Sequence, residues 1–116
     1  MYGMAPEREL TELRRGVVGP CVLALLERRE RFGLELVRDL TAADGLVTSE
    51  GTVYPLLNRL AAAGLVTSVW RDEPGQRPRR YYAITPKGRE SLAEFRRAWQ
   101  AFAATITAVL DPCGAS

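Results

Sequence analysis

The sequence contains no histidine and only two cysteines, Cys21 and Cys113, which lie far apart. Without histidine, a Ser-His-Asp triad and a Cys-His pair are both excluded. The cysteine positions have no metal-ligand spacing, and an inert buried thiol is the simplest interpretation of Cys21 in its apolar segment. No pair of carboxylates stands apart in an apolar setting. We therefore expect a protein that is not an enzyme, with no catalytic residues, no metal and no cofactor.

Long hydrophobic runs are also missing. The longest nearly uninterrupted apolar run, residues 17–26, is too short to span a bilayer and contains Gly19 and Pro20. No basic segment leads into a hydrophobic one at the N-terminus. We expect a cytoplasmic protein without membrane contacts, and 116 residues suit a single hydrophobic core.

Positive charge is scarce overall but concentrated in one place. The net charge is +2, yet residues 71–89 hold six cations and two anions, which leaves the rest of the chain with a net charge of −2. All but one of these cations are arginine, which suits bidentate contacts with phosphate or guanine. A GC-rich genome would also enrich arginine. The distribution of charge therefore indicates nucleic acid more strongly than its total does.

Residues 48–66 show the spacing of an amphipathic helix. Apolar side chains recur at i, i+3, i+4 and i+7, at Val53, Leu56, Leu57 and Leu60. Thr48 or Ser49 can cap a helix that starts near Ser49 or Glu50, and Gly64 ends it. The opposite face carries small, hydroxyl, amide and guanidinium groups. Such a face can contact phosphates and base edges, although a merely solvated face has a similar composition.

Residues 65–71 and 79–85 are rich in β-branched and aromatic side chains and predict a hairpin. Pro74-Gly75 between them suits a type II turn. Gln76, Arg77, Arg79 and Arg80 lie at the tip and on the return strand, where they can straddle a phosphate backbone or enter a minor groove. A solvated basic edge that deters strand pairing is the alternative.

Three further helices are expected around these elements. The segment from Leu10 to Leu26 has helical spacing, with a kink or a fresh helix start near Pro20. A short helix follows over residues 32–40, and Ala43-Asp44-Gly45 supplies a turn. Thr85-Pro86 starts a long last helix, as a cap followed by proline at the first helical position.

The last helix carries a heptad seam. Its apolar positions are separated alternately by three and four residues, at Leu92, Phe95, Trp99, Phe102, Ile106 and Val109. A lone domain could bury this seam on its own N-terminal helix. Because that helix also offers Leu13 and Val17, the better interpretation is a homodimer in which the first and last helices of both chains pack together.

Two separate motifs resemble the PadR family of bacterial transcriptional regulators. One is Gly-Thr-Val-Tyr-Pro-Leu-Leu at residues 51–57, followed by Arg59-Leu60 and Gly64-Leu65-Val66. The other is Arg-Arg-Tyr-Tyr-Ala-Ile-Thr at residues 79–85. The resemblance covers about residues 13–102. It implies a mainly α fold with a small β-hairpin (α+β), namely a winged helix-turn-helix dimer, usually a repressor, whose recognition helix is the helix that begins near Ser49.

The resemblance also implies a division of the chain. Residues 1–86 would form the DNA-binding domain, residues 87–111 a dimerisation helix, and residues 112–116 a flexible tail. The expected contacts with a double-stranded DNA operator come from Arg38, Ser49, Gly51, Thr52, Tyr54, Asn58, Gln76, Arg77, Arg79 and Arg80. For Arg38, a role as an ordinary surface arginine is the alternative.

Trp99 suggests an effector site. In some drug-responsive members of the resembled family, a tryptophan at the matching position stacks flat aromatic ligands near the dimer axis, and Phe95 and Phe102 would shape the same space here. Plain interface packing is the alternative interpretation of these rings. We therefore expect a repressor that a small molecule releases; the alternatives are an aromatic small-molecule sensor and a winged-helix protein-interaction module without specific DNA binding.

Overall fold

The computed structural model describes residues 6–43 and 50–111. Their elements are, in order, α1 (Pro6–Arg28), β1 (Arg31–Phe32), α2 (Gly33–Ala42), α3 (Glu50–Ala62), β2 (Val66–Arg71), β3 (Arg79–Ile84) and α4 (Pro86–Leu110). The mainly helical α+β fold is thereby confirmed. Ser49, the turn residues Asp44 and Gly45, and the tail 112–116 lie outside the described residues.

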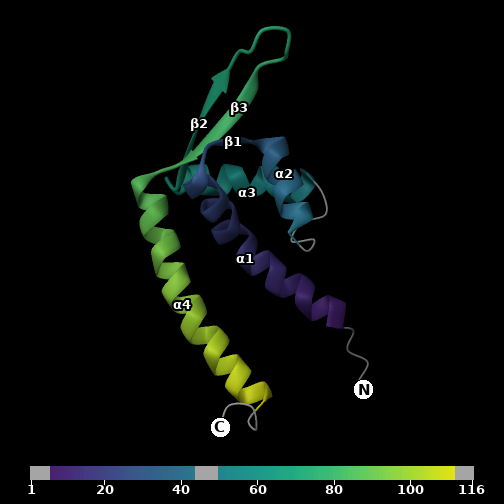
Figure 1. Ribbon diagram of the computed structural model, residues 1–116, viewed down its shortest axis with the longest axis vertical. Coiled ribbons are helices and arrows are strands. Elements are labelled where there is room, and N and C mark those ends of the chain that lie inside the picture. Colours follow the sequence, from purple (N-terminus) through teal and green to yellow (C-terminus); the bar gives the residue numbers. More distant parts are fainter. Residues whose placement is uncertain (1–5, 44–49, 112–116) are drawn as a thin grey trace.

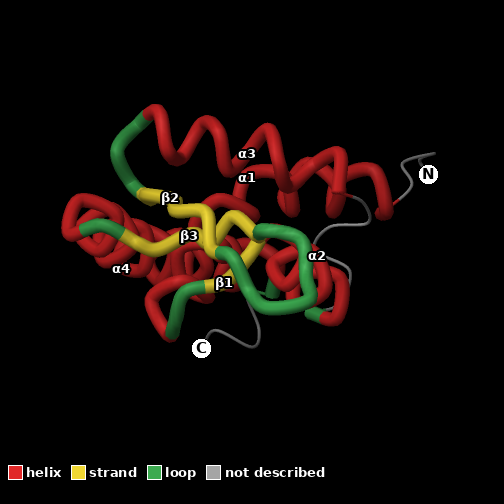
Figure 2. The backbone as a smooth tube through the Cα atoms, turned by 90° about the horizontal axis from the view of Figure 1, so that it is seen from above, coloured by secondary structure: helices red, strands yellow, loops and turns green. Residues whose placement is uncertain are grey.

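The molecule is elongated, with principal extents of 59 × 32 × 21 Å. The sheet and its hairpin extend from one end, and the N-terminal half of α1 and most of α4 diverge at the other (Figure 1). Viewed from above, α3 runs beside the strands (Figure 2). None of the described helices combines the length and the apolar character that a membrane span requires.

The core lies where the second half of α1 meets α2, α3 and the sheet. Its fully buried side chains include Val22, Leu36, Leu40, Val53 and Leu57. The four apolar positions predicted for the third helix, Val53, Leu56, Leu57 and Leu60, are all buried. Burial raises the pKa of the half-buried Cys21 thiol, which favours its protonated form.

The expectation of a fresh helix start near Pro20 is wrong, because α1 continues through Pro20 as one helix and begins earlier, at Pro6. Proline leaves the carbonyl oxygen of Gly16 without its usual i+4 donor. Gly16 is exposed, and a side-chain carbon on it would meet nothing within 4 Å. Water can therefore reach that carbonyl and replace the missing hydrogen bond.

The third helix ends as predicted at Gly64, whose φ of 79° lies in the left-handed region that glycine tolerates. The Leu65 amide donates to the carbonyl of Leu60 at 2.9 Å, and the Gly64 amide to that of Ala61 at 3.0 Å. These two bonds form a Schellman motif. Pro55 lies inside α3 without ending it.

The sheet has three antiparallel strands in the order β1-β3-β2. The predicted hairpin is confirmed, with Trp70 opposite Arg80 and Arg71 opposite Arg79. Its turn is closed by a 3.0 Å bond from the Gln76 amide to the Glu73 carbonyl, with Gly75 at a φ of 75°. The strand β1 was not predicted, because two residues carry no detectable period.

The start of α4 is also as predicted. The Thr85 hydroxyl accepts a 3.0 Å hydrogen bond from the Gly88 amide, and Pro86 occupies the first turn. The same hydroxyl donates to the Gly64 carbonyl at 2.7 Å, and the Thr85 amide donates to the Leu65 carbonyl at 3.1 Å. The first turn of α4 is therefore bonded directly to the end of α3.

Candidate nucleic-acid interface

The polar face of α3 points outward. Gly51, Thr52, Tyr54, Asn58 and Arg59 are all exposed, and they alternate with the buried apolar stripe of the same helix. Of the predicted contacts at this helix, only Ser49 lies outside the described residues. The exposed groups can donate to or accept from phosphates and base edges.

The hairpin extends well beyond the helical body (Figure 1). Gln76 and Arg77 near its tip and Arg80 on the return strand are exposed, and Arg79 is half-buried. Arg38 is exposed on α2. Among the described residues, none of these four arginines forms an ion pair with a carboxylate. Their charges are therefore available to an anionic partner.

Aromatic rings hold the hairpin arginines in place. The guanidinium carbon of Arg79 lies 4.4 Å from the centre of the Phe32 ring, and that of Arg80 lies 5.5 Å from the centre of the Tyr82 ring. The Arg80 Nε also donates to the Ser68 hydroxyl at 2.9 Å. Stacking of this kind orders a side chain but leaves its charge in place.

Arg71 is arranged differently from its neighbours. It forms an ion pair with Glu30 and lies 4.8 Å from the centre of the Tyr81 ring. The Tyr81 hydroxyl donates to the Glu73 carboxylate at 2.9 Å, and this hydrogen bond raises the pKa of Tyr81. The cationic stretch identified in the sequence is thus partly neutralised at its first residue.

A buried arginine ties the base of the hairpin to the helices. Arg31 on β1 is buried, and its Nε lies 2.9 Å from the Asp39 carboxylate of α2. Its Nη1 donates to the Leu25 carbonyl of α1. Because β1 pairs with β3, these contacts of Arg31 also connect the hairpin to α1 and α2. Sequence reasoning did not single out Arg31, because its partners Leu25 and Asp39 lie on two different helices that only the fold places on either side of it.

The N-terminus of α2 has its own polar network. The Glu35 carboxylate accepts from the Phe32 amide at 3.1 Å and from Arg29 at 2.9 Å. Burial alone would raise the pKa of Glu35, but these hydrogen bonds outweigh it and lower the pKa. The network fixes where α2 begins, next to β1.

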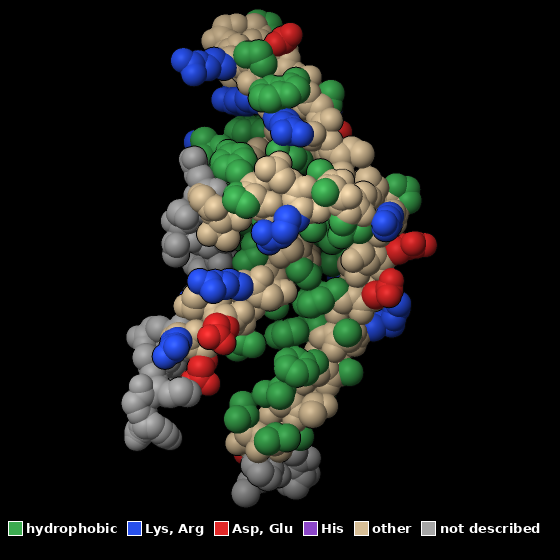
Figure 3. All heavy atoms as spheres, turned by 180° about the vertical axis from the view of Figure 1, so that it is seen from behind, with side chains coloured by type: hydrophobic (Ala, Val, Ile, Leu, Met, Phe, Trp, Pro, Cys, Tyr) green, Lys and Arg blue, Asp and Glu red, His purple; other side chains and the backbone are tan. Residues whose placement is uncertain are grey.

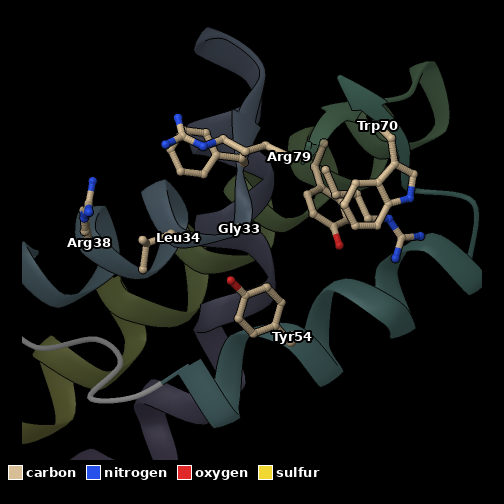
Figure 4. A pocket seen from close by; sticks show the side chains of 9 residues that line it. Gly33, Leu34, Arg38, Tyr54, Trp70 and Arg79 are labelled. Atoms are coloured by element: carbon tan, nitrogen blue, oxygen red, sulfur yellow. The ribbon is translucent and has the colours of Figure 1, made fainter. Parts of the chain in front are cut away.

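A cleft of about 450 Å³ lies where α2, α3 and the hairpin meet. Figure 4 shows Tyr54 rising from α3 toward Gly33, with Trp70 on the hairpin to one side and Leu34 and Arg38 on α2 to the other. We call this the wing cleft, and it is lined by Phe32, Gly33, Leu34, Arg38, Tyr54, Trp70, Arg79, Arg80 and Tyr82. Predicted contact residues from three elements therefore border one surface.

Tyr54 closes tightly over the start of α2. A side-chain carbon on Gly33 would lie 2.4 Å from Cε1 and 2.8 Å from the hydroxyl oxygen of Tyr54. Only glycine lets the tyrosine ring take this position without displacement. Tyr54 therefore has a packing role in addition to the DNA contact predicted for it.

Comparison with known proteins identifies the family. Residues 22–94 match the Transcriptional regulator PadR-like family. The chain belongs to that family. It is 38% identical over 97 residues to transcriptional regulator Rv3488 of Mycobacterium tuberculosis, across 84% of this chain and 89% of the relative.

Solved structures of PadR-like proteins share the fold. A PadR family transcriptional regulator from Eggerthella lenta is 35% identical, with a TM-score of 0.80 across 90% of this chain and 91% of its own. A PadR-like transcriptional regulator from Bacillus cereus is 32% identical, with a TM-score of 0.77 across 85% and 96% of the two chains. The resemblance inferred from the two sequence motifs is thereby confirmed.

In this PadR-like chain, the seam on α4 is largely uncovered. Trp99, Phe102, Ile106 and Val109 are exposed, as are Leu10 and Leu13 on α1. Figure 3 shows hydrophobic side chains along the length of α4. The rings of Phe95 and Trp99 are stacked with centres 6.1 Å apart, and Trp99 lies 6.3 Å from Phe102. Val17 and Phe95 are half-buried.

Leu92 does not belong to this uncovered seam. It was predicted at the dimer interface, but its side chain is only 2% exposed because it packs into the core of its own chain. Leu92 fits the heptad spacing because the same apolar stripe of α4 faces the core near the start of the helix and is exposed further along. The uncovered part of the seam therefore begins near Phe95.

The wing cleft also brings in residues that sequence reasoning missed. Trp70 is 65% exposed on β2, and Phe32, Leu34 and Tyr82 come from three other elements, β1, α2 and β3. Only Trp70 carried a usable signal, as a large aromatic residue next to the basic stretch. The others are ordinary apolar positions whose place at the cleft depends on how the elements pack.

Proposed function

We propose that this PadR-like regulator is a homodimer that binds a double-stranded DNA operator and represses transcription until a small molecule releases it. The observation that carries the proposal is the common border of α3 and the hairpin. Tyr54 of α3 and Arg79 and Arg80 of the hairpin line the same cleft. A single DNA duplex can thus meet the helix and the hairpin together.

In this proposal the N-terminal part of α3 enters the major groove. Gly51, Thr52 and Tyr54 of α3, together with Ser49, set register and sequence, and Asn58 bonds a nearby phosphate. Gln76, Arg77, Arg79 and Arg80 of the hairpin reach the backbone or the minor groove, and Arg38 of α2 reaches a phosphate. The arginines supply the part of the affinity that depends on salt.

The dimer follows from the uncovered apolar faces. The exposed side chains of α4 and of the first half of α1 form a surface that a second copy would bury. In a twofold dimer, the two recognition helices would lie about one DNA turn, roughly 34 Å, apart. Residues 1–86 would then act as the DNA-binding unit and residues 87–111 as the dimerisation helix.

Trp99 gives the dimer a candidate effector site. Trp99 is 44% exposed, and its indole lies between the rings of Phe95 and Phe102. Two such sets of rings facing each other would accept a flat aromatic molecule by stacking. A ligand there would change the angle between the two α4 helices, and with it the spacing of the recognition helices.

The test is binding to the DNA upstream of the protein's own gene, measured by fluorescence anisotropy at several salt concentrations beside an unrelated fragment. Tight, saturable preference for the upstream fragment supports the proposal. Arg79→Ala combined with Arg80→Ala should weaken binding to both fragments and flatten the salt dependence by about two phosphate contacts. Arg97→Ala, an exposed arginine on α4, is the matched control. Equal, weak binding to both fragments would reject the hypothesis that the protein regulates its own gene by sequence-specific binding.

A further inference from the structure

The wing cleft combines open volume, aromatic walls and arginines that form no ion pair with the carboxylates that the structure describes. Its volume of about 450 Å³ lies within the range of small-molecule sites. Among the described residues that line it, none carries a carboxylate. A surface that only had to attract DNA would need the charge, but it would need neither the hollow nor the exposed rings.

The charge of the cleft is selective for anions. Arg79 and Arg80 form no ion pair with any described carboxylate, in contrast to Arg71, which is paired with Glu30. Gly33 and Leu34, the first two residues of the ten-residue helix α2, also line the cleft. The Glu35 carboxylate in the first turn compensates the positive end of that helix dipole, so the arginines supply the positive charge of the cleft.

Arg79 and Arg80 are held in position in the absence of a ligand. Arg79 stacks on Phe32, and Arg80 stacks on Tyr82 while its Nε donates to Ser68. Their side chains therefore lose little further entropy when they bind an anion. The remaining N–H groups of Arg80 can donate to a carboxylate as charge-assisted hydrogen bonds.

Trp70 provides the surface for a ring. It is paired with Arg80 across the two strands, so the indole and the guanidinium lie on the same face of the hairpin. Trp70 is 65% exposed although it lines the cleft. An exposed indole beside a fixed guanidinium matches a ligand that is flat at one end and negatively charged at the other.

We propose that the wing cleft binds a planar aromatic anion, with the ring against Trp70 and the anionic group on Arg80. This site is separate from the stacked rings of α4. Because Tyr54, Arg79 and Arg80 are also proposed DNA contacts, the ligand competes directly with DNA. That competition, unlike the binding itself, rests on the proposed function.

The chain has only two tryptophans, Trp70 and Trp99, which makes the site directly observable. The ¹⁵N-labelled protein without DNA shows two indole N–H signals by NMR, and Trp70→Phe and Trp99→Phe assign them. The probes are 2-naphthoate and its uncharged counterpart 2-naphthamide. We expect 2-naphthoate to shift the Trp70 signal saturably. We expect 2-naphthamide to bind at least about tenfold more weakly.

Matched variants locate the anion. Arg80→Gln should weaken the binding of 2-naphthoate about tenfold or more, as expected for loss of a charge-assisted hydrogen bond. Arg97→Gln removes one exposed arginine from α4 and should leave the affinity unchanged. The proposal would be overturned if only the Trp99 signal shifted, or if no signal shifted at millimolar 2-naphthoate. Equal binding of both probes, or an equal loss of 2-naphthoate affinity in the two variants, would also overturn it.

A second arm adds DNA. Displacement of bound DNA by 2-naphthoate, but not by 2-naphthamide, supports direct competition at the cleft. If the protein binds 2-naphthoate at Trp70 but binds no DNA, the ligand site stands and the proposed function fails. If the protein binds DNA but 2-naphthoate does not shift the Trp70 signal, the proposed ligand site is rejected and the proposed function is retained.

Discussion

A side-chain carbon on Gly88 would lie 2.2 Å from the carbonyl oxygen of Leu65. Gly88 is in the first turn of α4, and Leu65 follows the glycine that ends α3. The Leu65 carbonyl also accepts from Thr85 at 3.1 Å. The proposed dimerisation helix and the proposed recognition helix are therefore in backbone contact, and a tilt of α4 would act on the end of α3.

Gly88→Ala should destabilise the protein. The added carbon meets backbone, which cannot move aside as a side chain can, so a loss of about 1–3 kcal/mol is expected. Gly16→Ala is the control, since its added carbon meets nothing within 4 Å in the middle of α1. That change should stabilise by about 0.5–1 kcal/mol through helix propensity. Thermal unfolding measures both, and an unchanged midpoint for Gly88→Ala would show that the contact can relax.

Gly33→Ala should alter function more than stability. The added carbon meets the ring of Tyr54, which can swing away from α2, so the wing cleft and the outward face of α3 change shape. DNA affinity should fall while the unfolding midpoint moves little. In the Tyr54→Ala background the same glycine change should have almost no further effect. Additive losses of affinity in the double variant would mean that the two residues act independently.

Phe102→Asp should dissociate the proposed dimer. Phe102 is 52% exposed on the uncovered seam, and a carboxylate there would have to be buried at the interface. Ala104→Asp places the same charge on an exposed α4 position outside the seam and should leave the dimer intact. Sedimentation velocity distinguishes monomer from dimer. A monomeric parent protein would remove the dimer from the proposal altogether.

Glu35 should contribute stability that disappears in acid. Its folded pKa is lowered, so the carboxylate stabilises the fold above its ordinary pKa of about 4.3 and loses that contribution as the pH falls through the folded value. Glu35→Gln should therefore cost about 1 kcal/mol at neutral pH and progressively less below about pH 4. Denaturant unfolding across this range is the measurement. A difference that stays constant down to pH 2 would assign the cost to packing.

Local signals in the sequence determined most of the elements. Val53, Leu56, Leu57 and Leu60 repeat with the period of a helix, and Gly64 ends that helix because the left-handed conformation suits glycine. The Pro-Gly pair closed the hairpin, and Thr85-Pro86 began α4. Each of these features depends on residues within a few positions of one another, so a single sequence is enough to predict it.

Tertiary structure decided what the exposed residues do. It paired β1 with β3, placed Leu92 in the core instead of on the seam, paired Arg71 with Glu30 and stacked Arg79 on Phe32. It also formed the wing cleft from β1, α2, α3 and both strands of the hairpin, with Trp70 on its wall. Periodicity reports which face of an element is apolar but not which neighbour covers that face. These contacts join residues far apart in the chain, and only the packing of the elements brings them together.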